Sequence, residues 1–513
     1  MSIRKLGMVF VVLLALSARV IPGPRTVDDA YITFRYARNL LAGQGFTYNP
    51  GEYVLGTTTP FYTGLMTGLG AISGGTQAPF PWLALGLNSL ADAITCILIW
   101  KIGRKSGFEW AGAATALAWA VAPFSVTFAI GGMETSIYVL LLTATMLAYL
   151  VRKHTLYALC ASLAFLTRPD ALILIAPLAL DRLVRTIRGE KIHLGEVLAF
   201  VIPVAGWYGF AWFYFGSPIP QSIYAKVAVY HLNPSDSFIR MIQHYATPFL
   251  EDQTLGAKVA IATGIFLYPF LTIIGALQVW RREPRLFAFI LFPWVYFLAF
   301  SLPNTLIFRW YLTPPMLPYF FFIFVGAWHL LHRLGMKIMP SLRNRVALSS
   351  IPGVLIMLIP LVFNLNAWTL HPDHGQDLPA PPMAWIKLEL LYQEVSTLIL
   401  PELSKNDLLA AGDVGILGFY TSARILDTVG LNSPVSMRYY PLPASQYVSN
   451  YAISTDLLID EKPDWVVAME IYGRNTFLVD PRFLQQYRLR YTLPTDIYGS
   501  HGLLVFQRIS PTS

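Results

Sequence analysis

Two adjacent carboxylates, Asp28 and Asp29, directly follow the first apolar segment of this 513-residue sequence. At helical spacing, Asp28, Tyr31, Arg35 and Arg38 share one face, so acidic and basic groups are displayed together beside the membrane. Such a face could carry out acid-base chemistry. A structural interpretation is also open, in which the carboxylates cap an interfacial helix and the arginines reach towards lipid phosphates. One carboxylate could cap while the other stays free for catalysis.

Metal and redox chemistry receive little support from the sequence. Asp28 and Asp29 could bind a divalent cation, but two adjacent carboxylates alone are a weak metal signal. No cofactor is therefore assigned, and a divalent cation at this pair stays open. Cys96 and Cys160 lie apart inside apolar runs, which indicates neither a disulfide framework nor a cysteine metal site.

The elements that must position these residues are membrane helices. The sequence is 55% hydrophobic and 13% charged, with a mean hydropathy of +0.52, which is outside the usual range of soluble globular proteins. Apolar runs long enough to cross or nearly cross the bilayer predict about eleven transmembrane helices. They cover 4–21, 81–101, 110–129, 134–151, 155–167, 170–184, 194–215, 257–280, 286–303, 311–331 and 346–366. The N-terminus resembles a signal peptide, but the many later spans favour an uncleaved first helix.

Loop charge predicts the orientation of these helices. Alternate loops are basic, as the positive-inside rule requires of cytoplasmic loops. They contain Arg4 and Lys5; Lys101, Arg104 and Lys105; Arg152 and Lys153; Arg182, Arg185, Arg188 and Lys191; Arg281, Arg282 and Arg285; and Arg333, Lys337, Arg343 and Arg345. The predicted protein is a multi-pass cell-membrane protein with a cytoplasmic N-terminus. Because its basic residues are scattered between apolar runs, a nucleic-acid partner is not expected.

The character of the sequence changes after the last apolar run. We predict a transmembrane domain over 1–366, a polar, Pro-rich linker over 367–382 and a small extracytoplasmic α/β domain over 383–513. Five segments of the last domain read as strands: LLAAG, ILDTVGL, DWVVAM, YRLRYTL and LLVFQRI, while 383–396 and 443–460 read as helices. Asp413 precedes Gly415 and Gly418, a pattern that favours a tight turn over a phosphate-binding loop.

The segment that begins at Asp28, DDAYITFRYARNLLAGQGFTYNPGE, resembles the first outer loop of bacterial GT-C glycosyltransferases. These are polytopic enzymes that use polyprenyl-phosphate sugars, and they include arabinofuranosyltransferase-like and mannosyltransferase-like proteins. Further similarity follows in the same order along the chain. It covers residues 132–135, 167–170, 216–218, 224–226 and 309–312, and the segment GDVGILGFYTSARILDTVGL. The resemblance therefore extends over nearly the whole chain.

The resemblance implies a transfer reaction at the outer face of the membrane. An acceptor hydroxyl of a cell-envelope glycan, lipid or protein would attack the anomeric carbon of a polyprenyl-phosphate sugar, either a hexose or a pentose. An acidic residue of the first outer loop would serve as general base, and this role falls on Asp28 or Asp29. The leaving lipid phosphate needs fixed cations near the membrane surface. Arg309 is the first candidate for that role, followed by Lys226 and Arg168.

Other polar residues are candidates for the substrate pocket. Tyr31, Arg35, Arg38 and Tyr224 belong to the matching segments. Glu134 lies at the end of an apolar run, where a carboxylate is costly unless it is solvated, paired or functional. It either caps the following helix or lines the pocket together with Asp170. Asn88 and Asp92, four residues apart in one span, are expected to form a buried structural pair.

The alternative function is a transporter or flippase of a lipid-linked or anionic substrate. It would require related halves and helices broken at mid-membrane, whereas the polar motifs here gather in predicted outer loops. A noncatalytic scaffold of the cell envelope is a third hypothesis. It would tolerate neutralisation of Asp28 and Asp29, which an enzyme would not.

Overall fold

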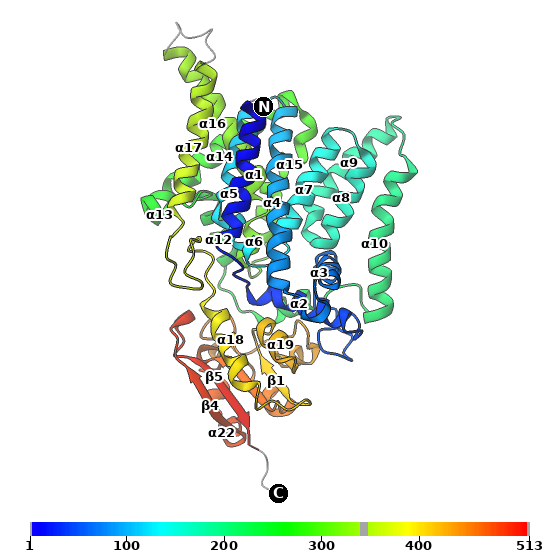
Figure 1. The fold of residues 1–513 in the computed structure, drawn as a ribbon, viewed down its shortest axis with the longest axis vertical. Helices are drawn as coiled ribbons and strands as arrows, with labels where there is room; N and C mark the ends of the chain where they lie inside the picture. Colours follow the sequence, from blue (N-terminus) through cyan, green and yellow to red (C-terminus); the bar gives the residue numbers. More distant parts are fainter. Residues whose placement is uncertain (1–2, 339–346, 510–513) are drawn as a thin grey trace. The chain divides into compact units, whose positions relative to one another are not determined.

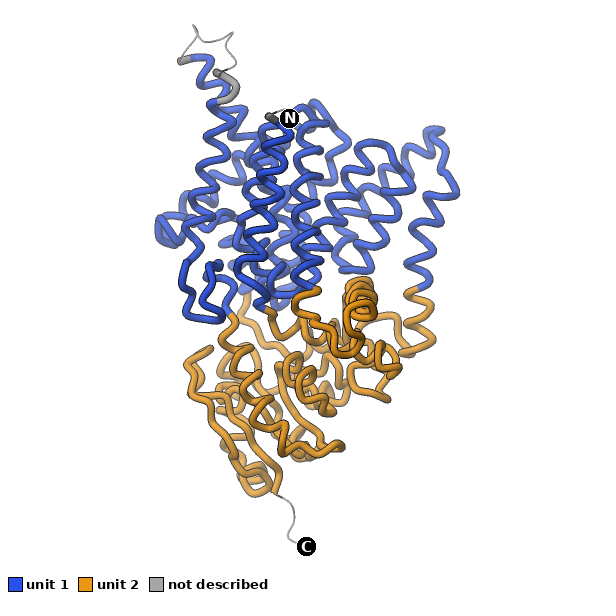
Figure 2. Tube along the Cα trace, in the orientation of Figure 1, with its two compact units in different colours: residues 1–25, 84–206, 235–385 blue, residues 26–83, 207–234, 386–513 orange. Residues whose placement is uncertain are grey.

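A computed structural model describes residues 3–338 and 347–509 of the chain. Arg343 and Arg345, which belong to one predicted basic loop, lie outside the described residues. So do the last four residues of the predicted C-terminal domain. The chain divides into two compact units (Figure 2). Unit 1 contains residues 1–25, 84–206 and 235–385, and unit 2 contains 26–83, 207–234 and 386–513.

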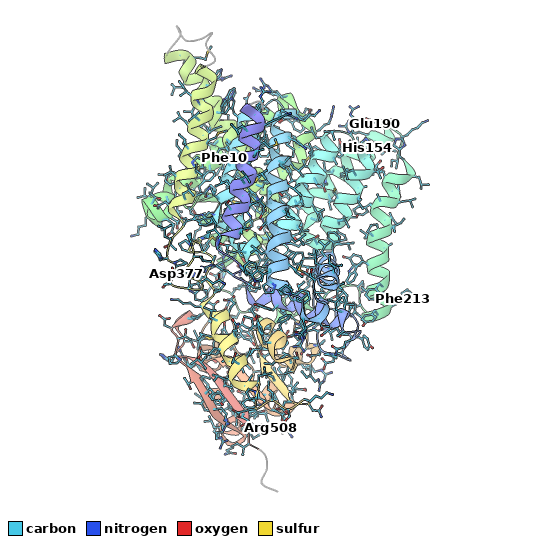
Figure 3. All side chains as sticks on the ribbon, in the orientation of Figure 1. Phe10, His154, Glu190, Phe213, Asp377 and Arg508 are labelled. Carbon is cyan, nitrogen blue, oxygen red and sulfur yellow. The ribbon has the colours of Figure 1, made fainter. Side chains whose placement is uncertain are left out.

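Unit 1 is built from helices, several of which run side by side in Figure 1. The helices that lie mainly in this unit are α1 (Ile3–Val20), α4 (Phe80–Lys105), α5 (Glu109–Val121), α6 (Pro123–Ile130), α7 (Thr135–Leu150), α8 (His154–Thr167), α9 (Leu172–Ile187), α10 (Leu194–Phe215), α12 (Asp236–Ala246), α13 (Asp252–Leu255), α14 (Ala257–Arg282), α15 (Phe287–Ser301), α16 (Met316–Ile338) and α17 (Ala347–Asn366). Long apolar side chains remain exposed along them, such as Phe10 of α1 at 59% (Figure 3). Outward-facing apolar residues are what a bilayer-embedded helix requires.

The described residues contain five helical segments that are long and apolar enough to cross a membrane. They are Phe80–Lys105, Leu194–Phe215, Ala257–Arg282, Pro284–Ser301 and Arg309–Lys337. A sixth span is counted if α5 and α6, which meet at Pro123 with a bend of 47°, form one broken span. The chain is therefore a multi-pass membrane protein. The predicted count of eleven spans is not established, since α7 and α8 are shorter than a full span.

The two half-length helices expected around residue 168 are confirmed. Helix α8 ends at Thr167, a 3-10 turn covers Pro169–Ala171, and α9 starts at Leu172. The pyrrolidine ring of Pro169 disfavours helical backbone at the preceding residue, and Arg168 is accordingly extended with φ −155° and ψ 131°. The Arg168 side chain is thereby held at a break between two helices.

The predicted linker, residues 367–382, is tied down within unit 1. Thr369 and Ala380 form an isolated antiparallel bridge. The buried guanidinium of Arg25 donates to the carbonyl oxygen of His374 at 3.1 Å and to that of Leu378 at 3.3 Å. These contacts give the segment a defined path. The predicted domain boundaries at 366 and 383 stay predictions.

Unit 2 contains a five-stranded mixed sheet. All five predicted strands are present, but the second ends at Asp427 and excludes the TVGL of the predicted segment. The strands are β1 (Leu408–Ala411), β2 (Arg424–Asp427), β3 (Trp465–Met469), β4 (Tyr487–Leu493) and β5 (Leu503–Arg508), in the order β2-β1-β3-β5-β4. Strand β1 pairs in parallel with β2 and β3, whereas β5 is antiparallel to β3 and β4. The central strand β3 is buried at every position, which explains its unbroken apolar sequence.

Eight helices complete unit 2. They are α2 (Asp28–Leu41), α3 (Pro60–Ile72), α11 (Gln221–Val229), α18 (Lys387–Ile399), α19 (Gly415–Thr421), α20 (Thr455–Glu461), α21 (Glu470–Gly473) and α22 (Pro481–Gln486). The helix predicted to begin at Asp28 is confirmed as α2, and the one predicted over 383–396 as α18. The helix predicted over 443–460 is wrong in extent: only 444–446 form a 3-10 turn, and α20 begins at Thr455 after its N-cap Ser454. Turns are favoured over a continuous helix here by Pro441 and Pro443 and by the nearby serines.

Candidate active site

The predicted polar face of α2 exists, and it packs against α19 within unit 2. Arg35 donates from Nε to the carbonyl oxygen of Tyr48 at 2.8 Å and from Nη2 to that of Ala423 at 2.7 Å. Arg38 donates to the carbonyl oxygen of Phe419 at 2.6 Å, and its guanidinium lies 4.5 Å from the centre of that ring. These contacts give both arginines a packing role. Their predicted place in a substrate pocket stays a prediction.

Tyr31 completes this face. Its hydroxyl lies 3.3 Å from that of Tyr420, and its ring packs against Phe419 at 5.3 Å between centroids. The side chain is 7% exposed, so contacts with α19 cover most of it. The face that was expected to be displayed beside the membrane is thus partly covered by α19 of the same chain.

The two adjacent carboxylates have different environments. Both Asp28 oxygens accept backbone N–H groups, from Gly415 and from Ile416, each at 2.8 Å. Asp28 therefore caps α19, whereas the N-cap position of its own helix, α2, is Val27, which has no capping side chain. Asp29 is half-buried, and among the described residues no hydrogen bond holds its carboxylate. The carboxylates were expected to cap the helix that they begin, which is wrong, since Asp28 caps α19 instead. A catalytic role for the other carboxylate stays a prediction.

Two glycines allow α19 to approach α2 closely enough for this cap. A Cβ on Gly415 would lie 1.8 Å from the backbone oxygen of Asp28. A Cβ on Gly418 would lie 2.2 Å from the Tyr48 hydroxyl and 2.3 Å from Nη1 of Arg35. Both glycines lie inside α19, so the tight turn favoured from the sequence is wrong. The small side chain is needed here for close packing, not for a left-handed backbone.

Asp28 and Asp29 belong to a cluster of carboxylates in unit 2. Glu389 of α18 accepts the backbone N–H of Asp28 at 3.4 Å, and Tyr392 donates its hydroxyl to Asp413 at 2.8 Å. Burial raises the pKa of Asp413 to about 6, although its bond from Tyr392 lowers it. Burial also raises the pKa of Glu389 to about 7, and the charges of Asp413 and Asp29 add to this. Repulsion among buried carboxylates favours shared protons in the neutral pH range.

Lys226 of α11 is a cation whose charge acts on Asp29 in this cluster. Burial raises the pKa of Asp29, and the positive charge of Lys226 opposes that rise. Burial also raises the pKa of Asp28 well above its usual range, and the next cause is the charge of Asp413. The structure thus brings the predicted residues Asp29 and Lys226 together. Tyr224, on the same helix, is 48% exposed.

Unit 1 holds a second constellation, which joins three predicted residues. Arg168 donates to both oxygens of Asp170, from Nε and Nη2, each at 3.0 Å. Its Nη1 lies 3.7 Å from Oε1 of Glu134, and its guanidinium lies 4.4 Å from the centre of the Tyr311 ring. Glu134 occupies the N-cap position of α7 but makes no capping hydrogen bond with its side chain. Two carboxylates therefore compensate the charge of Arg168, a setting that disfavours direct phosphate binding.

A pair of arginines in unit 1 lies outside this compensated site. Arg309 is exposed in the 3-10 turn Arg309–Leu312. Burial and the nearby charge of Arg309 lower the pKa of Arg240, a half-buried residue of α12. Among the residues that the structure describes, neither arginine forms an ion pair with a carboxylate. Neither guanidinium group is thus compensated by a carboxylate in the described part of the chain. The predicted role of Arg309 at the donor phosphate stays a prediction.

Several of these residues were not identified from the sequence. Arg240 lies in a segment with ordinary polar composition and carries no motif. Glu389 and Tyr392 are three residues apart in α18, on the side that also carries the buried Leu388, Val395 and Ile399. The sequence feature that could have identified Glu389 is its position on the apolar face of a predicted helix, where a carboxylate is unusual. Asp413 was considered only as part of a turn.

The pair Asn88 and Asp92 has the structural role that was expected. Asp92 accepts hydrogen bonds from Nε of Arg19 at 2.8 Å, from the Trp119 indole at 3.0 Å and from Ser136 at 2.8 Å. Asn88 donates to two backbone carbonyl oxygens, those of Ala129 and Met133. All of these side chains are buried. Arg19 thereby joins α1 to the bundle, a role that its sequence context did not indicate.

The described residues contain no group of three or more His, Cys, Asp or Glu side chains arranged to hold a metal ion. The cluster of Asp28, Asp29, Glu389 and Asp413 is thus not arranged as a ligand set. A divalent cation at Asp28 and Asp29 stays an open prediction.

Comparisons with known proteins bear on the fold. Residues 384–506 match a domain of unknown function, DUF8728, and no curated protein matches the sequence. This chain is similar in structure to ArnT from Cupriavidus metallidurans, whose crystal structure was solved with bound undecaprenyl phosphate. The alignment covers 98% of this chain and 97% of the ArnT chain, at 13% identity and a TM-score of 0.56. It is also similar to the Archaeoglobus fulgidus oligosaccharyltransferase, which was solved with a tethered acceptor peptide. That alignment covers 99% of this chain and 74% of the oligosaccharyltransferase, at 12% identity and a TM-score of 0.56. Both proteins belong to the GT-C superfamily, and the likeness shows that this chain has the GT-C fold.

Proposed function

We propose that the chain is an integral membrane glycosyltransferase that moves a sugar from a polyprenyl-phosphate donor to an acceptor hydroxyl. The observation that carries the proposal is the extent of the fold likeness, since 98% of this chain aligns with 97% of ArnT. ArnT binds undecaprenyl phosphate in that crystal structure, a molecule of the same chemical class as the leaving group proposed here. The acceptor is a glycan, lipid or protein of the cell envelope, and transfer takes place on the outer face.

Asp29 is the general base in this proposal. A base must have a free lone pair within reach of the acceptor hydroxyl, and both Asp28 oxygens are already engaged by backbone N–H groups. Burial raises the pKa of Asp29 towards neutral pH, where a carboxylate accepts a proton more effectively. Asp28 acts as a positioning residue, because it ties α19 to the start of α2.

Arg309 and Arg240 bind the donor phosphate in this proposal. As the glycosidic bond breaks, negative charge accumulates on the lipid phosphate, and the two guanidinium groups would stabilise it. Lys226, which lies near Asp29, is a second candidate for contact with the donor. Arg168 instead orients Asp170 and Glu134, which line the sugar or acceptor pocket.

The test compares Asp29→Asn with Asp28→Asn in membranes that contain the expressed chain and native acceptors. The probes are polyprenyl-phosphate hexoses and pentoses, and the readouts are sugar transfer and the apparent Tm of the purified protein. We expect Asp29→Asn to lower transfer by about 10²- to 10⁴-fold without lowering the Tm, because the variant removes a charge that burial disfavours. Asp28→Asn should lower the Tm, because its amide group cannot accept both N–H bonds.

The proposal has clear failure outcomes. Full transfer activity in Asp29→Asn and in the double variant would remove the base assignment. Movement of the lipid-linked donor across a reconstituted bilayer without sugar transfer would instead favour a transporter or flippase. Loss of activity in Arg309→Gln with a raised donor KM would support the phosphate role.

A further inference from the structure

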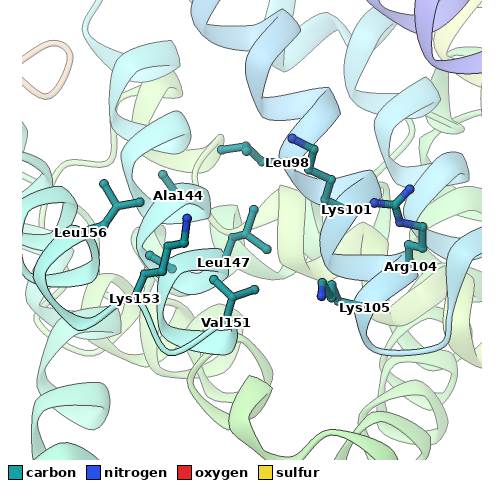
Figure 4. A pocket seen from close by; sticks show the side chains of 10 residues that line it. Leu98, Lys101, Arg104, Lys105, Ala144, Leu147, Val151, Lys153 and Leu156 are labelled. Carbon is teal, nitrogen blue, oxygen red and sulfur yellow. The ribbon is translucent and has the colours of Figure 1, made fainter. Parts of the chain in front are cut away.

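A basic cavity lies in unit 1, and none of the residues proposed for catalysis lines it. Figure 4 shows it between the C-terminal end of α4 and the α7–α8 connection. Its volume is about 230 Å³. Its four basic lining residues are Lys101, Arg104, Lys105 and Lys153, and all four are exposed. The rest of the lining is apolar.

Topology alone does not explain this arrangement. The positive-inside rule requires basic residues at this end of the bundle, but it does not require them to converge on one cavity. The neighbouring basic loop is partly neutralised: Arg182 pairs with Glu196 at 2.9 Å, and Arg185 pairs with Asp181 at 2.7 Å. Among the described residues, no carboxylate pairs with any of the four cations of the cavity. Their charge is therefore available to an external anion.

The apolar part of the lining identifies the kind of anion. Leu98, Leu147 and Leu156 come from three different helices and line the cavity together with Ala144. A freely soluble anion would gain nothing from these side chains. A phospholipid would place its phosphate among the basic groups and the first carbons of an acyl chain against the leucines. The volume is below the roughly 300–1,000 Å³ of pockets that enclose a whole small molecule, so only a headgroup and its adjacent carbons fit.

We propose that this cavity binds the headgroup of an anionic phospholipid from the leaflet at the basic end of the bundle. By the positive-inside rule this is the cytoplasmic leaflet. The site is separate from the proposed donor site at Arg240 and Arg309. It does not depend on the chain being a glycosyltransferase.

The test is native mass spectrometry of the purified full-length chain with three probes: short-chain phosphatidylglycerol, short-chain phosphatidylcholine and free glycerol phosphate. We expect phosphatidylglycerol to bind more tightly than either of the others. Lys105→Gln/Lys153→Gln should weaken its binding by about 10- to 30-fold, as expected for the loss of two cations near an anionic headgroup. The matched control, Lys5→Gln/Lys191→Gln, removes two exposed lysines from the same predicted side of the membrane and should leave binding unchanged.

A second variant tests the cavity without changing charge. Ala144→Phe fills part of the apolar wall and should also weaken phosphatidylglycerol binding, so it decides the question if the double variant fails to insert. Equal binding of phosphatidylglycerol and phosphatidylcholine would overturn the proposal. Equal loss in the control variant, or binding of glycerol phosphate as tight as that of the lipid, would do the same.

Discussion

At the scale of single residues, the buried ion pair between Arg19 and Asp92 is expected to contribute strongly to the stability of unit 1. Both side chains are fully buried, and Arg19 also donates to the backbone oxygens of Ala15 and Ala120. Removing one partner of a buried pair leaves an uncompensated charge, at a typical cost of about 3–5 kcal/mol. We expect Asp92→Ala to lower the apparent Tm of the detergent-solubilised protein sharply.

The control is replacement of both charges at once. Arg19→Met/Asp92→Leu removes the charges and retains apolar volume, so it should be less destabilising than Asp92→Ala alone. A double variant that unfolds as readily as the single one would show that the hydrogen bonds to Trp119 and Ser136 matter more than charge compensation.

Residue chemistry could be read from the sequence only where neighbours along the chain determine it. Asp28 and Asp29 stood out because they are adjacent, yet their difference depends on the backbone of Gly415 and Ile416, almost 390 residues away. Arg240 could not be selected, since its significance comes from Arg309. Contacts between residues so far apart in the chain leave no local sequence pattern from which they could be predicted.

At the scale of elements, the packing of α19 on α2 depends on the absence of side chains at two positions. We expect Gly415→Ala and Gly418→Ala each to destabilise unit 2 by about 1–3 kcal/mol, because each new Cβ would overlap an atom of α2 or of the following loop. Thermal unfolding of the purified protein measures this as a lower apparent Tm. Transfer activity should fall with it, since Asp28 loses its N–H partners.

Gly64→Ala is the matched control for these variants. Gly64 lies within α3 of the same unit, and a Cβ there would meet nothing within 4 Å. Alanine is favoured over glycine inside a helix by about 1 kcal/mol, so this variant should be neutral or slightly stabilising. A fall in Tm as large as that of Gly415→Ala would contradict the close-packing explanation.

Elements themselves were predicted well where the apolar pattern was strong. The five strands and the half-length helices α8 and α9 follow from short apolar runs bounded by turn residues. The break between α5 and α6 was missed, because the run 110–129 is apolar throughout and only Pro123 marks the bend. The helix predicted over 443–460 is absent from most of that range, because the turn residues of the segment outweigh its helical periodicity.

At the scale of the whole molecule, the carboxylates of unit 2 predict how stability depends on pH. Asp28, Asp29, Asp413 and Glu389 all have raised pKa values, with burial as the first cause in each case. The folded state therefore binds more protons than the unfolded state between about pH 4 and pH 7. Stability is greatest below this window and falls as pH rises through it, because folding must then keep buried charges.

Glu389→Gln tests this directly. Its pKa is about 7 in the folded protein against 4.5 for an ordinary glutamate, a difference of the order of 3 kcal/mol at alkaline pH. The wild-type apparent Tm should fall from pH 5 to pH 8, and the variant should fall less and exceed the wild type above pH 7. The two should converge near pH 5, where Glu389 is protonated. Glu394→Gln, an exposed position on the same helix, should leave the wild-type slope unchanged. Identical slopes in Glu389→Gln and wild type would show that Glu389 is not the group that titrates.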